Sequence, residues 1–348
     1  MPRSALMISA LCIGMVAPSV SDAQWEEQAS GTKASLRGIS AVSDEVAWAS
    51  GSGATVLRTM DGGSRWARVA PPPGSDSLDF RDVHAVSART AYLMSAGPGA
   101  QSRIYKTTDA GRSWTLQHSR SDSAFFLDAI AFWDSEHGVA MSDPVAGRFA
   151  VATTSDGGRR WVPVAPDSMP PALPGEAGFA AGGAALVTAG TRHAWFTTGG
   201  TAARVFASSD GGRSWMVAAT PLARGAASRG GFALAFADAR RGALVGGDYA
   251  APADGRSVAA VTTDGGRRWT LPPGPLPRGY RSGLALVPGT GGRTLVAVGT
   301  SGSDRSVDGG ATWQPLDTLA YNAVSFASRT AGWAVGPGGR VARWKGSR

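Results

Sequence analysis

An eight-residue pattern, Ser/Thr-x-Asp-x-Gly-x-x-Trp, occurs six times along the 348-residue chain. Its aspartate can accept hydrogen bonds from the backbone N–H groups of a tight turn, and its glycine permits backbone angles that a side chain forbids. Its tryptophan begins the next strand and carries a large apolar surface into the core. Each copy is therefore predicted to form a structural hairpin turn, here called a box turn. The aspartates and tryptophans of the six copies are Asp61 and Trp66, Asp109 and Trp114, Asp156 and Trp161, Asp210 and Trp215, Asp264 and Trp269, and Asp308 and Trp313.

The spacing of the box turns predicts the architecture. Successive box tryptophans lie 44 to 54 residues apart, a period typical of propellers and solenoids. Short alternating or apolar runs separate the boxes and leave room for four short strands in each period. The 48 glycines and 21 prolines suit many short strands joined by turns better than they suit long helices.

The two ends of the repeat region predict how the ring closes. Trp25 begins a strand like the one after each box, and residues 322–344 look like the first three strands of a blade without a box. We therefore expect the segment from Gln24 to complete this last blade, which removes exposed sheet edges. The prediction is an all-β, seven-bladed propeller of four-stranded antiparallel blades, forming a single domain over residues 24–348. Six and eight blades are the alternatives.

The first 23 residues have the pattern of a signal peptide. Arg3 is followed by a short apolar stretch, and Ser21 and Ala23 stand at the −3 and −1 positions of a cleavage site. We expect cleavage near Ala23 and a periplasmic or extracellular mature chain; a buried N-terminal helix or strand is the alternative. The lone Cys12 lies within this segment, after a leucine that disfavours lipid attachment. No later run reaches the length of a transmembrane helix.

Charge and motifs exclude several classes of function. The net charge is +8, but the basic residues are scattered, which does not favour a nucleic-acid partner. An anionic ligand, an acidic protein surface or a membrane face remains open. The four histidines show no metal-ligand spacing, so no metal site is expected: His84, His118, His137 and His193. No cofactor-binding motif occurs in a suitable context, and no cofactor is expected.

The box pattern resembles the Asp-box (BNR) repeat propellers. Residues 331–336 (AGWAVG) and 338–341 (GGRV) are similar to a blade phrase of the photosystem II stability/assembly factor-like family. Sialidase-like propellers share the box more distantly. The resemblance implies an extracytoplasmic scaffold that holds a partner protein. We therefore expect a binding protein with a protein partner in the cell envelope, acting as a monomer, with a glycan as the alternative ligand.

Polar and bulky residues are predicted to surround the mouth of the central channel. They enter the innermost strands or follow the second strands, so the expected binding face lies opposite the box turns. A structural or merely solvated role is the alternative for each of them. The set is Arg37, Arg81, Asp82, Asp128, Asp143, Glu176, Arg229, Asp248, Tyr249, Tyr280, Arg281, Ser282, Asp304, Tyr321 and Asn322.

A glycoside hydrolase of sialidase-like type is the rival hypothesis. The predicted set contains carboxylates, tyrosines and arginines, which such enzymes use. However, Arg37 is followed by Gly38 and Ile39, whereas Ile-Pro usually follows the first sialidase arginine. No catalytic residue is therefore assigned. The Pro-rich insertion at residues 166–178 is the expected location of specificity, with a disordered surface loop as the alternative.

Overall fold

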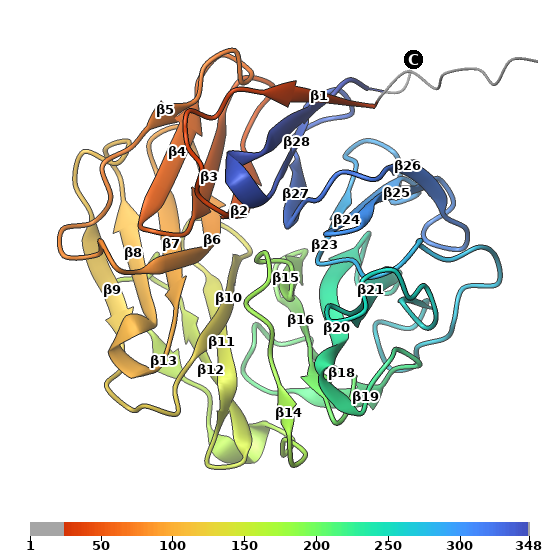
Figure 1. The fold of residues 1–348 in the computed structure, drawn as a ribbon. Coiled ribbons are helices and arrows are strands. Elements are labelled where there is room, and N and C mark those ends of the chain that lie inside the picture. Colours follow the sequence, from red (N-terminus) through yellow and green to blue (C-terminus); the bar gives the residue numbers. More distant parts are fainter. Residues whose placement is uncertain (1–23, 347–348) are drawn as a thin grey trace, which may run out of the picture.

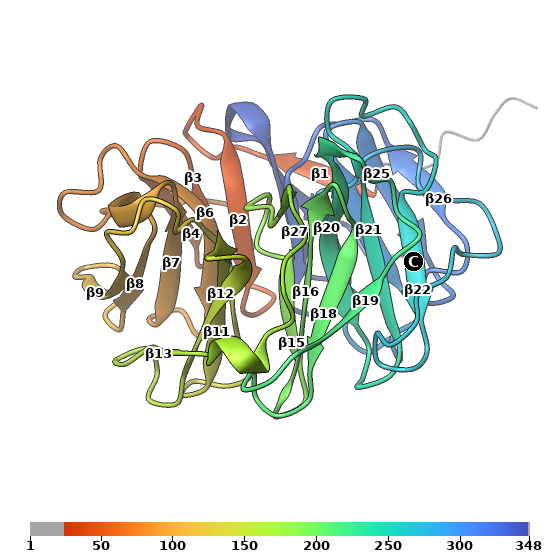
Figure 2. The ribbon, with the colours of Figure 1, turned by 90° about the horizontal axis from the view of Figure 1, so that it is seen from below.

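A computed structural model describes residues 24–346, so the predicted signal peptide lies outside the described residues. The described chain forms seven sheets arranged in a ring, which confirms the predicted seven-bladed propeller (Figure 1). Seen from the side, the sheets stand next to one another around the central axis (Figure 2). Three 3₁₀ turns are the helical elements of this part of the chain: η1 (Gly99–Gln101), η2 (Pro166–Ser168) and η3 (Pro337–Gly339).

Six of the seven blades are four-stranded antiparallel sheets, and their strands follow chain order from the innermost strand outward except where β1 joins the last blade. Blade 1 contains β2 (Leu36–Ala41), β3 (Ala47–Gly51), β4 (Thr55–Thr59) and β5 (Ala67–Arg68). Blade 2 contains β6 (Asp79–Ala85), β7 (Ala91–Ala96), β8 (Arg103–Thr107) and β9 (Thr115–Ser119). Blade 3 contains β10 (Leu127–Phe132), β11 (Gly138–Val145), β12 (Arg148–Thr154) and β13 (Val162–Pro163). Blade 4 contains β15 (Leu186–Ala189), β16 (His193–Thr197), β18 (Arg204–Ser208) and β19 (Met216–Ala219).

Blade 5 departs from the plain pattern. Its main strands are β20 (Ala226–Phe236), β21 (Gly242–Asp248) and β22 (Ala259–Thr262), and its outer strand is reduced to one bridge between Val261 and Thr270. Two short strands, β14 (Glu176–Ala177) and β17 (Gly199–Gly200), pair beside the first part of β20. Blade 6 contains β23 (Gly283–Leu286), β24 (Leu295–Gly299), β25 (Gly302–Ser306) and β26 (Gln314–Asp317).

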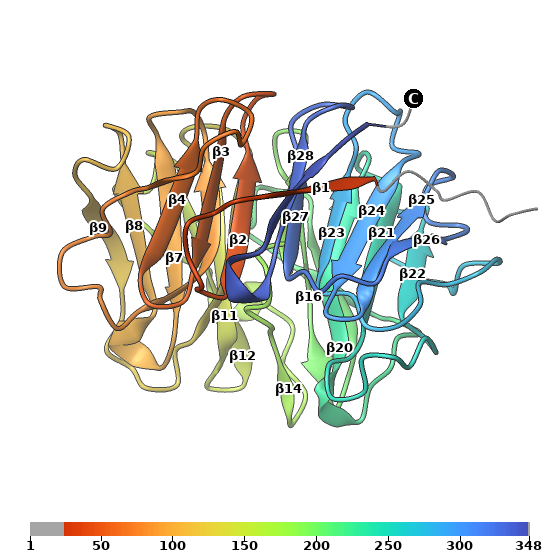
Figure 3. The same cartoon turned by 45° about the horizontal axis from the view of Figure 1, so that its top comes forward.

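Blade 7 joins the two ends of the described chain. Its first three strands are β27 (Ala323–Phe326), β28 (Gly332–Val335) and β29 (Val341–Trp344), and β1 (Trp25–Gln28) is the fourth. Strand β1 runs beside the last blade (Figure 3), and it pairs antiparallel with β29, with Trp25 opposite Trp344. The two indoles meet edge to face at 5.1 Å, and the Trp25 Nε1–H donates to Ser303 Oγ in blade 6. The predicted closure is therefore confirmed.

The hydrophobic core is divided among the seven boundaries between neighbouring blades. Each boundary has its own buried apolar cluster. Large buried side chains from adjacent blades meet there, as when Trp195 of blade 4 stacks on Phe236 of blade 5 at 3.6 Å. Because each sheet packs on both of its faces, its inner strands are buried along their length, as in β7 and β10, whereas outer strands such as β5 and β9 are largely exposed.

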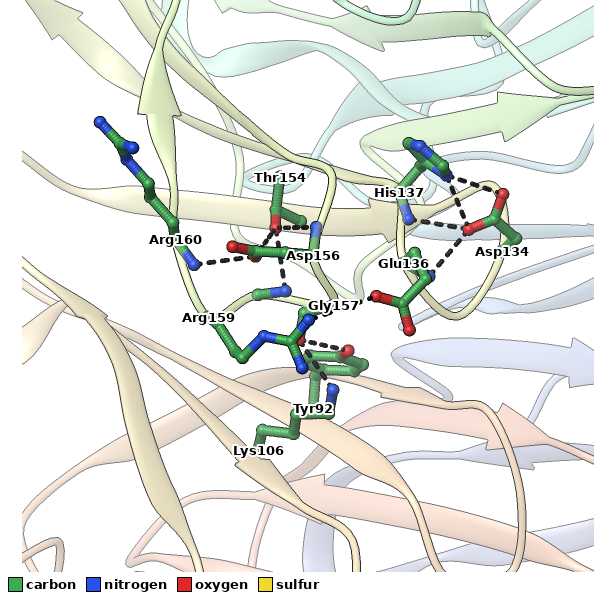
Figure 4. A network of polar contacts seen from close by, with 11 residues as sticks. Tyr92, Lys106, Asp134, Glu136, His137, Thr154, Asp156, Gly157, Arg159 and Arg160 are labelled. Atoms are coloured by element: carbon green, nitrogen blue, oxygen red, sulfur yellow. Dashed lines mark hydrogen bonds and ion pairs between the residues drawn. The ribbon is translucent and has the colours of Figure 1, made fainter.

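The box turn of blade 3 shows how these turns are held (Figure 4). The Thr154 hydroxyl donates to Asp156 Oδ1 at 2.9 Å, and the same carboxylate oxygen accepts the Arg160 N–H at 2.9 Å. The Gly157 N–H donates to the Glu136 carbonyl in the first hairpin turn of the blade. The Gly157 carbonyl accepts hydrogen bonds from Tyr92 and Lys106 of blade 2. The turn thus connects its own blade to the preceding one.

Equivalent hydrogen bonds recur in all six box turns. In each, the residue after the aspartate donates its N–H to the first hairpin turn of the same blade, at 2.8–2.9 Å. The box turns and the first hairpin turns therefore share one face of the ring. The innermost strands begin at the opposite face, which is called the channel-mouth face below.

Candidate functional site

A segment formed by residues 178–184 crosses the centre of the ring (Figure 1). This central segment connects β14 to β15, the innermost strand of blade 4. Its Ala180 carbonyl accepts a hydrogen bond from Arg81 of blade 2 at 3.2 Å. Its Ala184 carbonyl accepts the Leu234 N–H of blade 5 at 2.9 Å. The predicted Pro-rich insertion therefore continues into an ordered segment that spans the channel.

Three glycines bring the backbone of the central segment against other blades. A Cβ at Gly178 would overlap the Asp128 carboxylate, and a Cβ at Gly183 would overlap that of Asp82. A Cβ at Gly182 would approach the Asn322 carbonyl to 2.8 Å. Gly183 also has a φ of 81°, which side chains rarely adopt. Small residues are therefore required where the segment passes between the innermost strands.

The remaining contacts of the central segment are apolar. Phe179 stacks on Phe232 of blade 5, with ring centroids 3.9 Å apart and planes 12° from parallel. Ala181 packs with Phe232 and with Tyr280, which precedes the innermost strand of blade 6. Together with its polar contacts, the segment lies against residues of blades 2, 3, 5, 6 and 7 and crosses the channel whose mouth was predicted to bind a ligand.

Two buried carboxyl groups lie beneath the central segment. Burial raises the pKa of Asp82 to about 6, although the Ile130 N–H donates to this carboxyl at 3.1 Å. Burial, together with the neighbouring Asp143, raises the pKa of Asp128 well above its usual range. Asp143 accepts the Gly178 N–H at 2.7 Å. These carboxyls face the backbone of the segment, so they do not form an open acidic pocket.

Three further carboxylates of the predicted set are paired with arginines. Glu176 forms an ion pair with Arg204. Asp248 binds Arg229 at 2.9 Å, and this hydrogen bond lowers the pKa of Asp248. Asp304 binds Arg281 Nε at 2.6 Å, and both side chains are almost completely buried. The partner Arg204 was not among the predicted site residues.

Two of these carboxylates lie on elements other than those expected. Glu176 was expected to enter the innermost strand of blade 4, but it lies in β14, which pairs with β17 beside blade 5. Asp304 was expected in a loop after a second strand, but it lies in β25, the third strand of blade 6. In both cases the sequence pattern was assigned to the wrong strand: Glu176 to the innermost strand of blade 4, and Asp304 to the loop before β25.

Two arginines of the predicted set have different surroundings. Arg81 binds Asp79 at 2.6 Å in addition to the carbonyl of the central segment. Arg37 is half-buried, and its guanidinium makes no hydrogen bond or ion pair within residues 24–346. Burial, followed by the positive charge of Arg81, lowers the pKa of Arg37. Arg37 is therefore the cation of the predicted set that most needs an external anion.

The predicted residues between blades 6, 7 and 1 are structural. The Ser282 hydroxyl donates to the Asn322 carbonyl at 2.9 Å. The Asn322 side chain in turn donates to the Leu36 carbonyl at 2.7 Å. Tyr321 is fully buried and packs against Trp25 at the ring closure. These residues join neighbouring blades and are not accessible to a ligand.

Four aromatic side chains form a cluster on the channel-mouth face, here called the aromatic patch: Phe179, Phe232, Tyr249 and Tyr280. Phe232 contacts Tyr280 edge to face at 4.8 Å and Tyr249 at 6.1 Å. Tyr249 remains 51% exposed, whereas Tyr280 is buried. Burial raises the pKa of Tyr280 above its ordinary value. The sequence predicted the two tyrosines but not the phenylalanines, because Phe179 lies in the central segment, Phe232 lies in β20, and the two share no local pattern.

The described residues contain neither a helix that could span a membrane nor a group of side chains that could bind a metal ion. Within residues 24–346, no helix is both long and apolar enough to cross a bilayer. In the same part of the chain, no three His, Cys, Asp or Glu side chains are arranged to hold a metal ion. The candidate site therefore consists of the aromatic patch, the half-buried Arg37 and the ion pair of Arg229 with Asp248.

The fold defines a seven-bladed β-propeller whose first strand completes its last blade. A solved structure of YCF48 bound to D1 peptide shares this fold, with a TM-score of 0.67 and 16% sequence identity, and the match covers 95% of this chain and 99% of that one. YCF48 from Cyanidioschyzon merolae has a TM-score of 0.61 and 18% sequence identity, and the match covers 92% of this chain and 98% of that one. A GH74 xyloglucanase from Xanthomonas campestris has a TM-score of only 0.45 and a sequence identity of 15%. The match covers 88% of this chain and 57% of the xyloglucanase chain. The sequence matches no family model and no curated protein sequence.

Proposed function

We propose that this propeller is a binding scaffold that holds an extended segment of a partner protein on its channel-mouth face. The observation that carries the proposal is the aromatic patch, where the exposed Tyr249 lies on three less exposed rings. Exposed aromatic side chains supported by a rigid cluster are typical anchors of protein interfaces. The unpaired Arg37 adds a group that could bind an acidic residue of the partner.

The similarity to YCF48 supports a peptide as the ligand. One of the two YCF48 structures is described as bound to a D1 peptide, so a propeller of this fold can bind a peptide. At 16% identity the likeness concerns the fold, and the identity of the partner is not carried over. From this similarity we take only that the ligand is a peptide.

The state of the carboxylates favours binding over glycoside hydrolysis. Hydrolysis by the usual route needs two carboxyl groups facing a sugar in an open cleft. In this propeller Asp82 and Asp128 face the central segment, and Glu176, Asp248 and Asp304 are held by arginines. A filled channel also gives a broad surface, which suits a polypeptide better than a single sugar ring.

The location of the protein is part of the proposal. We propose that residues 1–23 direct export, that the mature chain begins at Gln24, and that the partner is an envelope protein bound by a monomer. N-terminal sequencing of the protein from the producing cell tests the first two statements. A mature chain that still began with Met1 would contradict them.

Site-specific photocrosslinking tests the binding face. A benzoylphenylalanine at Tyr249 should give one discrete, saturable adduct in the envelope fraction, whereas the same residue at Met60 should give none. Met60 is the matched control because it is 50% exposed and belongs to a box turn on the opposite face.

A peptide from the crosslinked region then provides the quantitative test. It should bind the purified chain with 1:1 stoichiometry, and Tyr249→Ala should weaken binding about tenfold or more, as loss of an aromatic anchor does. Equal adducts at Tyr249 and Met60 would contradict the proposed face. Turnover of a chromogenic glycoside by the purified chain would support the rival enzyme instead.

A further inference from the structure

A cavity of about 600 Å³ lies at the outer rim between blades 2 and 3, away from the aromatic patch. Its volume falls in the range of sites that bind small organic ligands. One side is formed by the end of blade 2, and the other by β12 and the segment after β13. Its wall is mostly apolar. Phe125, Leu127, Ala140, Ala150 and Ala152 belong to the boundary between blades 2 and 3, whereas Phe149, Val151, Val164 and Met169 reach the wall from the boundary between blades 3 and 4.

Blade 3 has a small side chain beside the cavity at a position where two other blades carry a ring. Ala152 lies nine residues before its box tryptophan, at the position of Tyr105 in blade 2 and Phe206 in blade 4. Those two aromatic residues are buried between blades. Ala150, on the same face of β12, also lines the cavity. Blade 5 also has an alanine at this position, Ala260, which is buried in its own cluster, so the alanine alone does not make a cavity. In blade 3 it accompanies Ala150 on the wall of an open space.

The short outer strand of blade 3 provides an entrance. Strand β13 pairs only with Ala152 and Thr153 of β12. By contrast, β19 pairs along β18 from Arg204 to Ala207. Beside the first half of β12 lies an irregular segment instead of a strand: the Val164 N–H donates to the Val151 carbonyl at 2.8 Å and the Ala172 N–H to the Gly147 carbonyl at 2.9 Å. A ligand could enter there without separating the blades.

Cationic side chains lie beside this apolar wall, and no acidic ones do. Arg120, Arg148 and His118 line the cavity, whereas none of its sixteen described lining residues is Asp or Glu. Arg120 lies over the Phe125 ring, and its ion pair with Asp122 is long, at 3.9 Å. Arg148 donates one hydrogen bond, to the Met169 carbonyl. Burial, then the charge of Arg120, lowers the pKa of His118, so the arginines carry the positive charge at neutral pH.

We propose that this cavity binds a free straight-chain carboxylate, with the aliphatic chain along the apolar wall and the carboxylate at Arg120 and Arg148. The apolar wall favours an aliphatic chain because burying that surface removes it from water. Two arginines, of which only Arg120 has an acidic partner and that at 3.9 Å, favour a single anionic head, which guanidinium groups bind well. A polar or multiply charged ligand would bury unpaired polar groups against the wall at a large cost.

Calorimetric titration of the purified chain with octanoate, decanoate and dodecanoate tests the proposal. Each added methylene should tighten binding about fourfold while the cavity has room. Dodecyl maltoside, which has the same chain but a neutral head, should bind at least about tenfold more weakly than dodecanoate.

Two sets of variants separate the chain and head-group sites. Ala152→Phe restores the kind of residue found in blades 2 and 4 and should abolish dodecanoate binding without lowering the unfolding midpoint. If Ala152→Phe does not fold, Ala150→Leu is used in its place, because it narrows the same cavity and should also abolish dodecanoate binding. Arg120→Ala with Arg148→Ala should weaken binding at least about tenfold. Arg68→Ala, an exposed rim arginine of β5, is the matched control and should change nothing.

The outcomes distinguish this cavity from the aromatic patch. Absence of saturable binding of dodecanoate up to about 1 mM would overturn the proposal, as would undiminished binding by folded Ala152→Phe. Equal binding of dodecyl maltoside would overturn the carboxylate site. None of these results bears on crosslinking at Tyr249, so the two proposals can fail separately.

Discussion

At the scale of single residues, the buried carboxyl groups under the central segment have the strongest consequences. Asp82 and Asp128 lie where water cannot stabilise a negative charge, so the folded protein favours their protonated forms. Near neutral pH the unfolded chain ionises both groups readily. The pKa of Asp82, at about 6, implies that burial of this carboxyl destabilises the folded state at physiological pH.

Asp82→Asn should therefore stabilise the protein in a pH-dependent way. The folded state binds more protons than the unfolded state above about pH 4, so wild-type stability should fall as the pH rises from about 4 to about 6. The variant should remove this part of the decline and be more stable at pH 7 by about 2–3 kcal/mol, but not at pH 4. Urea unfolding at both pH values measures the difference. Asp76→Asn, an exposed neighbour, should show none, and an equal gain at pH 4 would contradict the argument.

The box hydroxyls provide a second prediction at this scale. The Thr107 Oγ1 donates to Asp109 and accepts the buried N–H of Gly111 at 2.9 Å. Thr107→Val should leave that N–H without a partner and cost about 1–3 kcal/mol in unfolding free energy. Thr107→Ser keeps the hydroxyl, as the boxes with Ser208 and Ser306 do, and should cost much less. Similar losses in both variants would show that the methyl group matters more than the hydrogen bonds.

At the scale of elements, the central segment is the feature that distinguishes this chain from a plain repeat. Its contacts reach five blades, and its small residues are fixed by backbone geometry and by neighbours that are remote in sequence. The sequence of residues 178–185 is rich in Gly and Ala, which suits close packing. However, such a run has no periodicity, so it predicted neither strand nor channel filling. Only the preceding Pro-rich stretch could be recognised from the sequence as a departure from the repeat.

Gly183→Ala tests the fit of the central segment. The added Cβ would meet the Asp82 carboxylate and would also strain a backbone with φ of 81°. Gly190→Ala is the matched control, because its φ of 58° is also positive but no heavy atom lies within 4 Å of the added Cβ. Backbone strain alone should cost about 1–2 kcal/mol in each variant, and Gly183→Ala should cost clearly more in urea unfolding. Equal costs would mean that the segment can move aside.

The prediction of the site was weaker than that of the blades for a physical reason. The hydroxyl and carboxylate hydrogen bonds that shape each box turn lie within eight residues, so a local pattern predicts the turns. The partners of the predicted acids come from other strands: Arg204 reaches Glu176 across 28 residues, and Arg281 reaches Asp304 across 23. Such pairs depend on strand register and on the path of the insertion. The sequence indicated which polar residues lie near the channel, but it could not show which of them are accessible to a ligand.

At the scale of the whole molecule, stability depends on how the ring closes. The core is divided into seven clusters between blades, so no single centre holds the fold together. The boundary between blades 6 and 7 uses Trp25, a residue far in sequence from the others in its cluster. Closure could be predicted from the sequence because the incomplete last blade lacked one strand and the first segment offered one.

Trp25→Ala should weaken this closure strongly. The indole packs on Trp344, Tyr321 and Phe326, and it is almost fully buried. Its removal should cost about 3–5 kcal/mol, as for other buried tryptophans. Urea unfolding followed by circular dichroism measures the loss, and Glu26→Ala on the exposed face of β1 is the control. A loss below about 1 kcal/mol would imply that the other boundaries hold the ring without this residue.

The pairing of β1 with β29 also has a consequence for synthesis. The ribosome makes β1 among the first strands and β29 last, with more than 300 residues between them. At about 5–20 residues per second, this interval lasts on the order of 15–60 s. During that time β1 has no native partner and the forming blades have an open edge. A chain that stalls before Val341 can therefore build blades, but it cannot become a closed ring.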